Sequence, residues 1–213
     1  MPVKLKIHHQ DDFHLVVWER REDEYYFHSK MPIFQDEEEI ISKLSSRKKL
    51  EWLSSRYLLH LMSGRYDRAK FTKDIHGKPH LEDSDHHVSI SHSHEMVAVI
   101  ASKYLVGIDI QYRVEKIARI QHKFVSEREE KYLLPHDHIT GLHIIWGAKE
   151  ALYKAYGKRL LDFKKHIFIH DLKYEASKGS FKGSVSKDDY TKDFELFYKL
   201  FDQYIIVYAK ELS

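Results

Sequence analysis

The hydrophobic period changes several times along this chain, and the order of the changes restricts the fold more than any other feature. Near the start, Val3, Leu5 and Ile7 alternate with polar residues, which is the period of a strand. From Ser46 to Met62, apolar residues recur every three or four positions, which predicts a helix that ends at Gly64. A chain that mixes the two periods in this way is predicted to be an α+β protein.

Three strand-like segments follow that helix, with short polar connections between them. They are VSIS, MVAVIAS and LVGIDIQ, and we expect them to form an antiparallel meander. Two further helices are predicted, over about 114–134 with a stop at Pro135, and over about 139–156 with Gly157 as the C-terminal cap. The remainder alternates again and predicts four strands: HIFIHDLKYE, SFKGSVSK, FELFYKLF and QYIIVYAK.

Composition excludes several classes of protein. With 35 basic and 33 acidic residues and a net charge of +2, the chain lacks the basic excess of a dedicated nucleic-acid binder. It has no cysteine, which excludes disulfides, thiolate nucleophiles and Cys-ligated zinc. The sequence begins without the apolar run of a signal peptide, and no stretch approaches the ~20 apolar residues of a membrane span. We therefore expect a soluble, cytoplasmic protein that binds neither nucleic acid nor membrane.

The segment VGIDIQ, residues 106–111, carries the first candidate site residues. In a strand, Asp109 and Gln111 share one face beside Gly107, while the three apolar side chains share the other face. Two oxygen donors on one strand face could bind a hard cation such as Mg²⁺. Taken alone, the hexapeptide is interpreted more simply as a strand that ends at the surface.

The predicted helix over 139–156 has a narrow polar seam beside an apolar stripe. The stripe consists of Ile145, Ala148, Leu152 and Ala155. The seam holds His143, Glu150 and Lys154, with Gly147 on the same line. Gly147 lowers helix stability by about 1 kcal/mol relative to alanine, and it clears space one turn before Glu150. The alternative is a surface Glu–Lys pair worth about 0.3–0.5 kcal/mol, but the glycine favours a functional seam.

The segment HHVSISHSHE contains four histidines, which raises the question of a zinc site. By strand parity, His86, His92 and His94 share one face and His87 points away. Because neighbouring strand positions rarely converge on one ion, we favour another interpretation. Ser91 and His92 at a strand end could offer a hydroxyl and an imidazolium to a phosphate.

Two basic features complete the candidate site. Lys78 lies in HGKP, where Gly77 and Pro79 fix the turn and orient the lysine. Arg56 and Lys49 lie seven residues apart on nearly the same face of the predicted helix over 46–62. Each of these basic side chains, taken alone, is interpreted as a solvated surface charge. Together with the carboxylates they predict a site for a polyanion and a divalent cation.

Four short motifs follow one another along the chain: GKP, SISHS, GID and WxxKExxxK. In this order and at these intervals the chain resembles the 4′-phosphopantetheinyl transferases of the Sfp type. SSRKKLEWLSSRYLL and KFVSEREEKYL also resemble segments of that family, so the resemblance covers most of the chain. It implies two similar α/β halves packed as an intramolecular pseudo-dimer, with coenzyme A in the cleft between them. The halves would be 1–104 and 105–213, and the protein would be a monomer.

The resemblance also implies a reaction. Such enzymes use Mg²⁺ and transfer the phosphopantetheine arm of coenzyme A to a serine of an apo acyl or peptidyl carrier protein, releasing 3′,5′-ADP. By the same analogy Glu150 would help to deprotonate the serine, and Lys154 would neutralise charge on the pyrophosphate. The implied metal ligands are Asp109, Gln111 and Glu150. The implied coenzyme A contacts are Arg56, Lys78, Ser91, His92 and Lys154.

One position departs from the family pattern. Many relatives have a glutamate where this chain has Gln111, so the site would hold two carboxylates instead of three. Our hypothesis is that Gln111 shifts metal affinity without abolishing catalysis.

Two alternatives to this enzyme were weighed. A non-catalytic coenzyme A or carrier-protein binding module of the same fold is disfavoured because Asp109, Glu150 and Lys154 are all present. A different Mg²⁺-dependent enzyme, such as a nucleotide hydrolase, is disfavoured because no GxxxxGK[ST] loop occurs.

Overall fold

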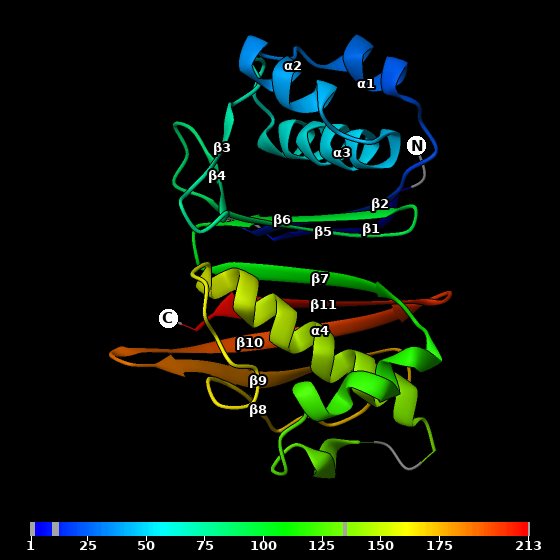
Figure 1. The fold of residues 1–213 in the computed structure, drawn as a ribbon, viewed down its shortest axis with the longest axis vertical. Helices are drawn as coiled ribbons and strands as arrows, with labels where there is room; N and C mark the ends of the chain where they lie inside the picture. The colour runs from blue at the N-terminus through cyan, green and yellow to red at the C-terminus, as the bar shows by residue number, and fades with distance from the viewer. Residues whose placement is uncertain (1–2, 10–12, 134–135, 213) are drawn as a thin grey trace.

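Runs of strands are separated by runs of helices in a computed structural model that describes residues 3–9, 13–133 and 136–212 (Figure 1). The elements are β1 (Val3–His9), β2 (Phe13–Glu19), α1 (Glu24–Lys30), α2 (Gln35–Ser42), α3 (Ser46–Ser63), β3 (Phe71–Lys73), β4 (Pro79–Leu81), β5 (His87–Ser93), β6 (Met96–Ser102), β7 (Val106–Tyr112), the 3₁₀ helices η1 (Glu115–Lys123) and η2 (Glu130–Tyr132), α4 (His138–Tyr156), β8 (Ile167–His170), β9 (Lys178–Lys187), β10 (Tyr190–Phe201) and β11 (Tyr204–Glu211).

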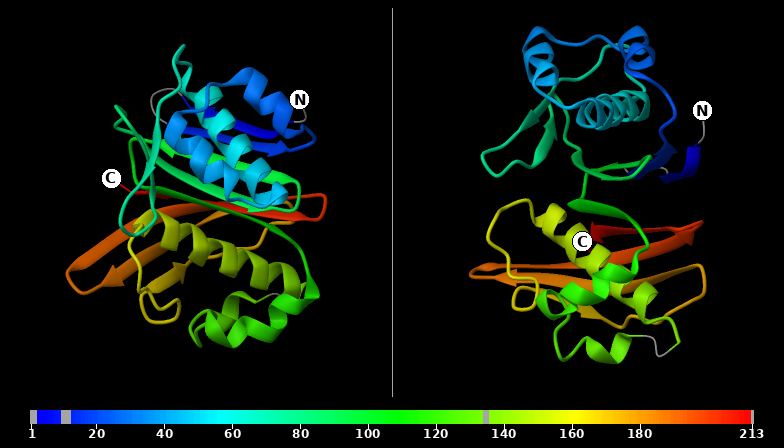
Figure 2. Two further views of the ribbon diagram at one scale, coloured as in Figure 1. Left: turned by 45° about the horizontal axis from the view of Figure 1, so that its top comes forward. Right: turned by 45° about the vertical axis from the view of Figure 1, so that its right-hand side comes forward.

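Two antiparallel sheets lie face to face and form the centre of the molecule (Figures 1 and 2). The first has the strand order β1-β2-β6-β5-β4-β3 and is covered on its outer face by α1–α3. The second has the order β7-β11-β10-β9-β8 and is covered by α4. The predicted α+β class with two similar halves is confirmed. Every described strand of the first sheet precedes Tyr104 and every described strand of the second follows it, although the halves as domains remain a proposal.

Three buried apolar clusters hold these layers together. One lies between α1–α3 and the first sheet, one between the two sheets, and one between α4 and the second sheet. Ile108 belongs to the cluster between the sheets, whereas the residues before and after it on β7 face α4. Strand alternation therefore turns the apolar face of β7 toward the first sheet and its polar face toward α4.

Close packing of β7 on α4 depends on Gly107. A Cβ at Gly107 would lie 1.8 Å from the carbonyl oxygen of Ala151, a backbone atom that cannot move aside. The strand therefore approaches the helix more closely than any side chain would permit. This approach brings the side chain of Asp109 directly beneath α4.

The two longest helices, α3 and α4, were predicted correctly. α3 ends at Gly64, whose φ of 62° is left-handed, and α4 ends at Gly157 with a φ of 74°. α4 begins after Asp137, whose side chain accepts a hydrogen bond from the amide of Thr140. Within residues 3–9, 13–133 and 136–212, no helix is both long and apolar enough to cross a membrane.

The predicted three-stranded meander is wrong in its last strand. β5 and β6 do pair antiparallel, but β7 pairs with β11 and belongs to the other sheet. The reason is that the short connection 103–105 carries the chain from one sheet to the other. Hydrophobic alternation identifies a strand and its buried face, but it does not identify the strand beside it.

The predicted helix over 114–134 is also wrong. The structure has η1 and η2 instead, separated by a turn. Glu129 closes that turn, because its Oε2 accepts hydrogen bonds from both the amide and the hydroxyl of Ser126. The predicted stop at Pro135 lies outside the described residues. α1 and α2 were not predicted.

Candidate active site

Three elements bring Ser91, Asp109 and Lys154 together. The ammonium of Lys154 on α4 lies 2.8 Å from Asp109 Oδ1 and 3.1 Å from Ser91 Oγ, and it donates to the carbonyl of Ile108 at 2.9 Å. Ser91 on β5 donates to the same Oδ1 of Asp109 at 2.9 Å. Side chains from β5, β7 and α4 therefore meet at one point between the two halves.

Glu150 lies one turn before Lys154 on α4, and its carboxylate is half-buried. It makes no hydrogen bond or ion pair with any residue that the structure describes. Burial raises the pKa of the Glu150 carboxyl, Lys154 opposes the rise, and the charge of Asp109 adds to it. Glu150 and Asp109 are thus close enough to repel each other, and the carboxylate of Glu150 is free to bind a ligand.

This donor set fits a magnesium ion. The described part of the chain holds no group of three or more His, Cys, Asp or Glu side chains that could bind a metal. Magnesium, however, binds through one or two carboxylates and keeps waters and substrate phosphate oxygens as its other ligands. A divalent cation would also offset the repulsion between Asp109 and Glu150. These two residues are the ones that would hold it.

Gln111 is bound to His143 through both ends of its amide. His143 Nδ1 lies 2.7 Å from Gln111 Oε1, an oxygen that can only accept a hydrogen bond, while Nε2 lies 3.0 Å from the amide nitrogen and 3.2 Å from the carbonyl oxygen of Val114. Gln111 Nε2 in turn donates to the carbonyl of His143 at 3.1 Å. Gly147 makes room for this amide, because a Cβ there would lie 2.6 Å from Gln111 Nε2. Metal ligation by Gln111 stays a prediction. Its Oε1 would have to bind the metal while it also accepts the hydrogen bond from His143.

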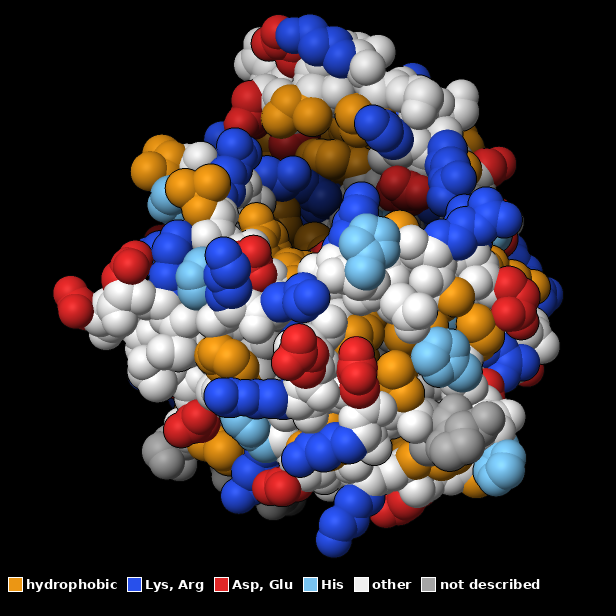
Figure 3. Space-filling model, turned by 60° about the horizontal axis from the view of Figure 1, so that its bottom comes forward, with side chains coloured by type: hydrophobic (Ala, Val, Ile, Leu, Met, Phe, Trp, Pro, Cys, Tyr) orange, Lys and Arg blue, Asp and Glu red, His pale blue; other side chains and the backbone are white. Residues whose placement is uncertain are grey.

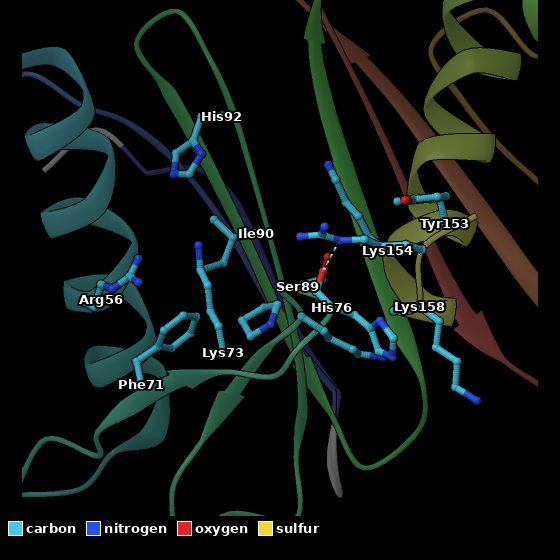
Figure 4. Close-up of a pocket in the computed structure, with 15 residues that line it drawn as sticks. Arg56, Phe71, Lys73, His76, Ser89, Ile90, His92, Tyr153, Lys154 and Lys158 are labelled. Carbon is cyan, nitrogen blue, oxygen red and sulfur yellow. Dashed lines mark hydrogen bonds between the residues drawn. The ribbon is translucent and has the colours of Figure 1, made fainter. Parts of the chain in front are cut away.

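A pocket of about 310 Å³ opens between the halves beside this cluster (Figure 4). Arg56 and Lys73 lie on its N-terminal side, and Lys154 and Lys158 lie on its C-terminal side. None of the described residues that line it is acidic. Figure 3 shows a hollow on this face of the molecule, with Lys and Arg side chains gathered around it. The pocket is therefore suited to a ligand with several negative charges.

Arg56 is held rigidly at the wall of the pocket. Its guanidinium carbon lies 4.1 Å from the ring centre of Trp52 and 4.2 Å from that of Phe71. Burial lowers the pKa of Arg56 to about 9, and its Nε has no hydrogen-bond partner among the described residues. A guanidinium at the wall of the pocket favours an anionic ligand there.

Lys78 and His92 both line the pocket, but each already has a protein partner. Lys78 Nζ donates to the carbonyl of Ala155 at 2.7 Å, which ties the N-terminal half to the end of α4. His92 Nε2 lies 3.2 Å from the carbonyl of Glu51, and burial lowers the pKa of His92 to about 4. The ring is therefore neutral at pH 7, contrary to the imidazolium expected from the sequence. His92 would offer a positive charge to a phosphate only after its ring had taken up a proton.

Sequence reasoning missed Lys149, the lysine inside WxxKE. Lys149 is completely buried, and its Nζ lies 2.7 Å from Glu129 Oε2 and 2.7 Å from the carbonyl of Phe163. This ion pair fastens the segment before α4 to the helix that carries Glu150. The available signal was a lysine between Ala148 and Ala151, where the helix has alanines on its buried face. Lys73 and Lys158 in the pocket were missed as well.

Comparison with known proteins agrees with this geometry. Residues 105–209 match the family model of the 4′-phosphopantetheinyl transferase superfamily. A curated relative, the 4′-phosphopantetheinyl transferase gsp of Aneurinibacillus migulanus, is 33% identical over 111 residues. That alignment covers 51% of this chain and 46% of the relative, so it spans less than half of the relative's length. Residues 105–209, about half of the chain, are thus similar to the 4′-phosphopantetheinyl transferase superfamily, which bears out the resemblance seen in the motifs.

Proposed function

We propose that this protein transfers the 4′-phosphopantetheine arm of coenzyme A to a serine hydroxyl of an apo acyl or peptidyl carrier protein. The observation that carries the proposal is the meeting of Asp109, Lys154 and Ser91, with the free carboxylate of Glu150 one turn away, beside a pocket without acidic residues. The similarity of residues 105–209 to the superfamily supports the same conclusion.

The charges of the pocket suit coenzyme A. This substrate carries a 3′-phosphate and a pyrophosphate, and several cationic side chains line the pocket from both halves. Arg56 offers a guanidinium at the pocket wall, while Lys154 offers an ammonium next to Asp109. Because one chain supplies both sides of the pocket, we propose that the protein works as a monomer.

The proposed reaction is a single displacement at phosphorus. The carrier serine Oγ attacks the β-phosphorus of coenzyme A, the bond from that phosphorus to the bridging oxygen breaks, and 3′,5′-ADP leaves. Glu150, whose pKa is raised by burial, accepts the serine proton directly or through a water. Lys154 donates a hydrogen bond to the leaving phosphate and offsets its growing charge. A magnesium ion held by Asp109 and Glu150 would supply further neutralisation of the pyrophosphate.

Product analysis tests this proposal against its alternatives. The protein is incubated with coenzyme A, Mg²⁺ and an apo acyl carrier protein, and the nucleotide products are separated by chromatography. We expect 3′,5′-ADP only when the carrier has its serine, and almost none with Glu150→Gln. Free phosphate as the product would indicate a hydrolase. Coenzyme A binding without any product would indicate a binding module.

A further inference from the structure

β7 is an edge strand of the second sheet, so half of its backbone amides have no strand to bond. A row of serine hydroxyls on β5 takes the place of that missing strand. Ile108, Ile110 and Tyr112 donate their amide protons to the Oγ atoms of Ser89, Ser91 and Ser93 at 3.2, 3.1 and 2.9 Å, respectively. We call these three hydrogen bonds the serine ladder.

The spacing of the serine ladder follows from strand geometry. Alternate residues of any strand lie on the same face and repeat at nearly the same distance, so hydroxyls at 89, 91 and 93 match amides at 108, 110 and 112. Val88, directly before Ser89, and Ile90, between Ser89 and Ser91, pack instead in the cluster beneath α3. A slip of one residue would bring apolar side chains opposite the amides, so the serine ladder fixes the register of the two halves.

The middle rung of the serine ladder belongs to the candidate active site. Besides the amide of Ile110, Ser91 contacts Asp109 Oδ1 and Lys154 Nζ. Its proton and its acceptor positions are therefore all in use within the protein. Within the described residues, no hydrogen bond joins Ser89 or Ser93 to these two charged groups, yet both bond the strand that carries Asp109.

We propose that Ser89 and Ser93 are positioning residues, which hold β7 in register on β5 so that Asp109 meets Ser91 and Lys154. The inference rests on the proposed function for its catalytic consequence. Ser93 is the better site for a test, because Ser89 also lines the pocket and Ser93 does not.

The test compares Ser93→Ala with a matched control, Ser102→Ala. Ser102 is a completely buried serine of β6 that accepts an amide proton from Tyr104 outside the serine ladder. The first measurement is amide hydrogen exchange by NMR, which does not depend on activity. In Ser93→Ala we expect the Tyr112 amide to exchange about tenfold faster, as the loss of one hydrogen bond implies, and in Ser102→Ala we expect no change there.

The second measurement is the affinity for Mn²⁺, used as a paramagnetic substitute for Mg²⁺, together with the kinetics of transfer. In Ser93→Ala we expect weaker Mn²⁺ binding and a lower kcat, with an unchanged KM for coenzyme A because the Arg56 side of the pocket is intact. Ser93→Thr keeps a hydroxyl, so its Mn²⁺ affinity and its kcat should be close to those of the wild type. If Ser93→Ala does not fold, Ser89→Ala and Ser93→Thr provide the same comparison.

Two results would overturn the inference. One is a wild-type protein in which the amides of Ile108, Ile110 and Tyr112 exchange freely. The other is a Ser93→Ala protein with a fast Tyr112 amide but wild-type Mn²⁺ affinity and kcat. A third outcome separates the two proposals. If the wild-type protein protects these amides but transfers nothing, and Ser93→Ala weakens Mn²⁺ binding, the proposed function is contradicted and the positioning role is supported.

Discussion

Replacing Lys149 with methionine should destabilise the protein strongly, because it breaks a completely buried ion pair. Lys149 and Glu129 approach to 2.7 Å with 0% and 3% of their side chains exposed. Removing one partner of a buried pair costs about 3–5 kcal/mol, because the other charge stays in the interior without compensation. Glu129 would keep its hydrogen bonds from the amide and hydroxyl of Ser126 and from the amide of Ile169, which do not neutralise its charge.

Thermal unfolding measures this loss. For a chain of this size each kcal/mol shifts Tm by about 2–4 °C, so Lys149→Met should lower Tm by roughly 6–20 °C. The double variant Lys149→Met/Glu129→Gln should lose less than the sum of the two single variants, because no unpaired charge remains.

The surface supplies a matched control. Lys43 and Glu39 form an ion pair at the same 2.7 Å, but their side chains are 71% and 74% exposed. Lys43→Met should change the free energy of unfolding by less than about 1 kcal/mol. If Lys149→Met lost no more stability than Lys43→Met, the reasoning that burial makes this pair important would be refuted.

Three further predictions concern the strand, the metal site and pH. Gly107→Ala should lower the free energy of unfolding by about 3 kcal/mol or more, since its Cβ would meet the Ala151 carbonyl; an unchanged urea midpoint would contradict this. Gln111→Glu should bind Mn²⁺ more tightly but unfold at a lower temperature, because it no longer donates to the His143 carbonyl; an identical Mn²⁺ titration would remove Gln111 from the metal site. His92 has a pKa of about 4 in the folded protein against an ordinary value of 6.5, so the unfolded chain binds more protons between these values. The stability contributed by neutral His92 is complete above pH 6.5 and is lost as the pH falls toward 4. Unfolding of wild type and His92→Gln at pH 7 and pH 5 should therefore show a smaller decrease for the variant.

Structural features that depend on a single helix or strand were predictable from the sequence. Gly64 and Gly157 end their helices, and the parity of β7 correctly separates Ile108 from Asp109 and Gln111. The polar seam of α4 was also visible in the sequence, and the structure places it against β7, where His143 contacts Gln111 and Lys154 contacts Asp109. These features depend on helix and strand periods, which the sequence displays directly.

Features that depend on how elements meet could not be predicted. The period of β7 does not reveal that β11 is its neighbour or that serines of β5 bond its free edge. The buried pair of Lys149 and Glu129 joins residues 20 positions apart, and either residue alone is expected at the surface. The neutral state of His92 likewise results from burial that only the packed structure produces.

The central claim is that this chain modifies a carrier serine with the help of Asp109, Glu150 and Lys154. The most direct measurement is the intact mass of an apo acyl carrier protein after incubation with this protein, coenzyme A and Mg²⁺. The account predicts a gain of one phosphopantetheine arm, which is absent with EDTA and with Glu150→Gln. No gain on several carrier proteins, in a preparation that binds coenzyme A, would contradict it.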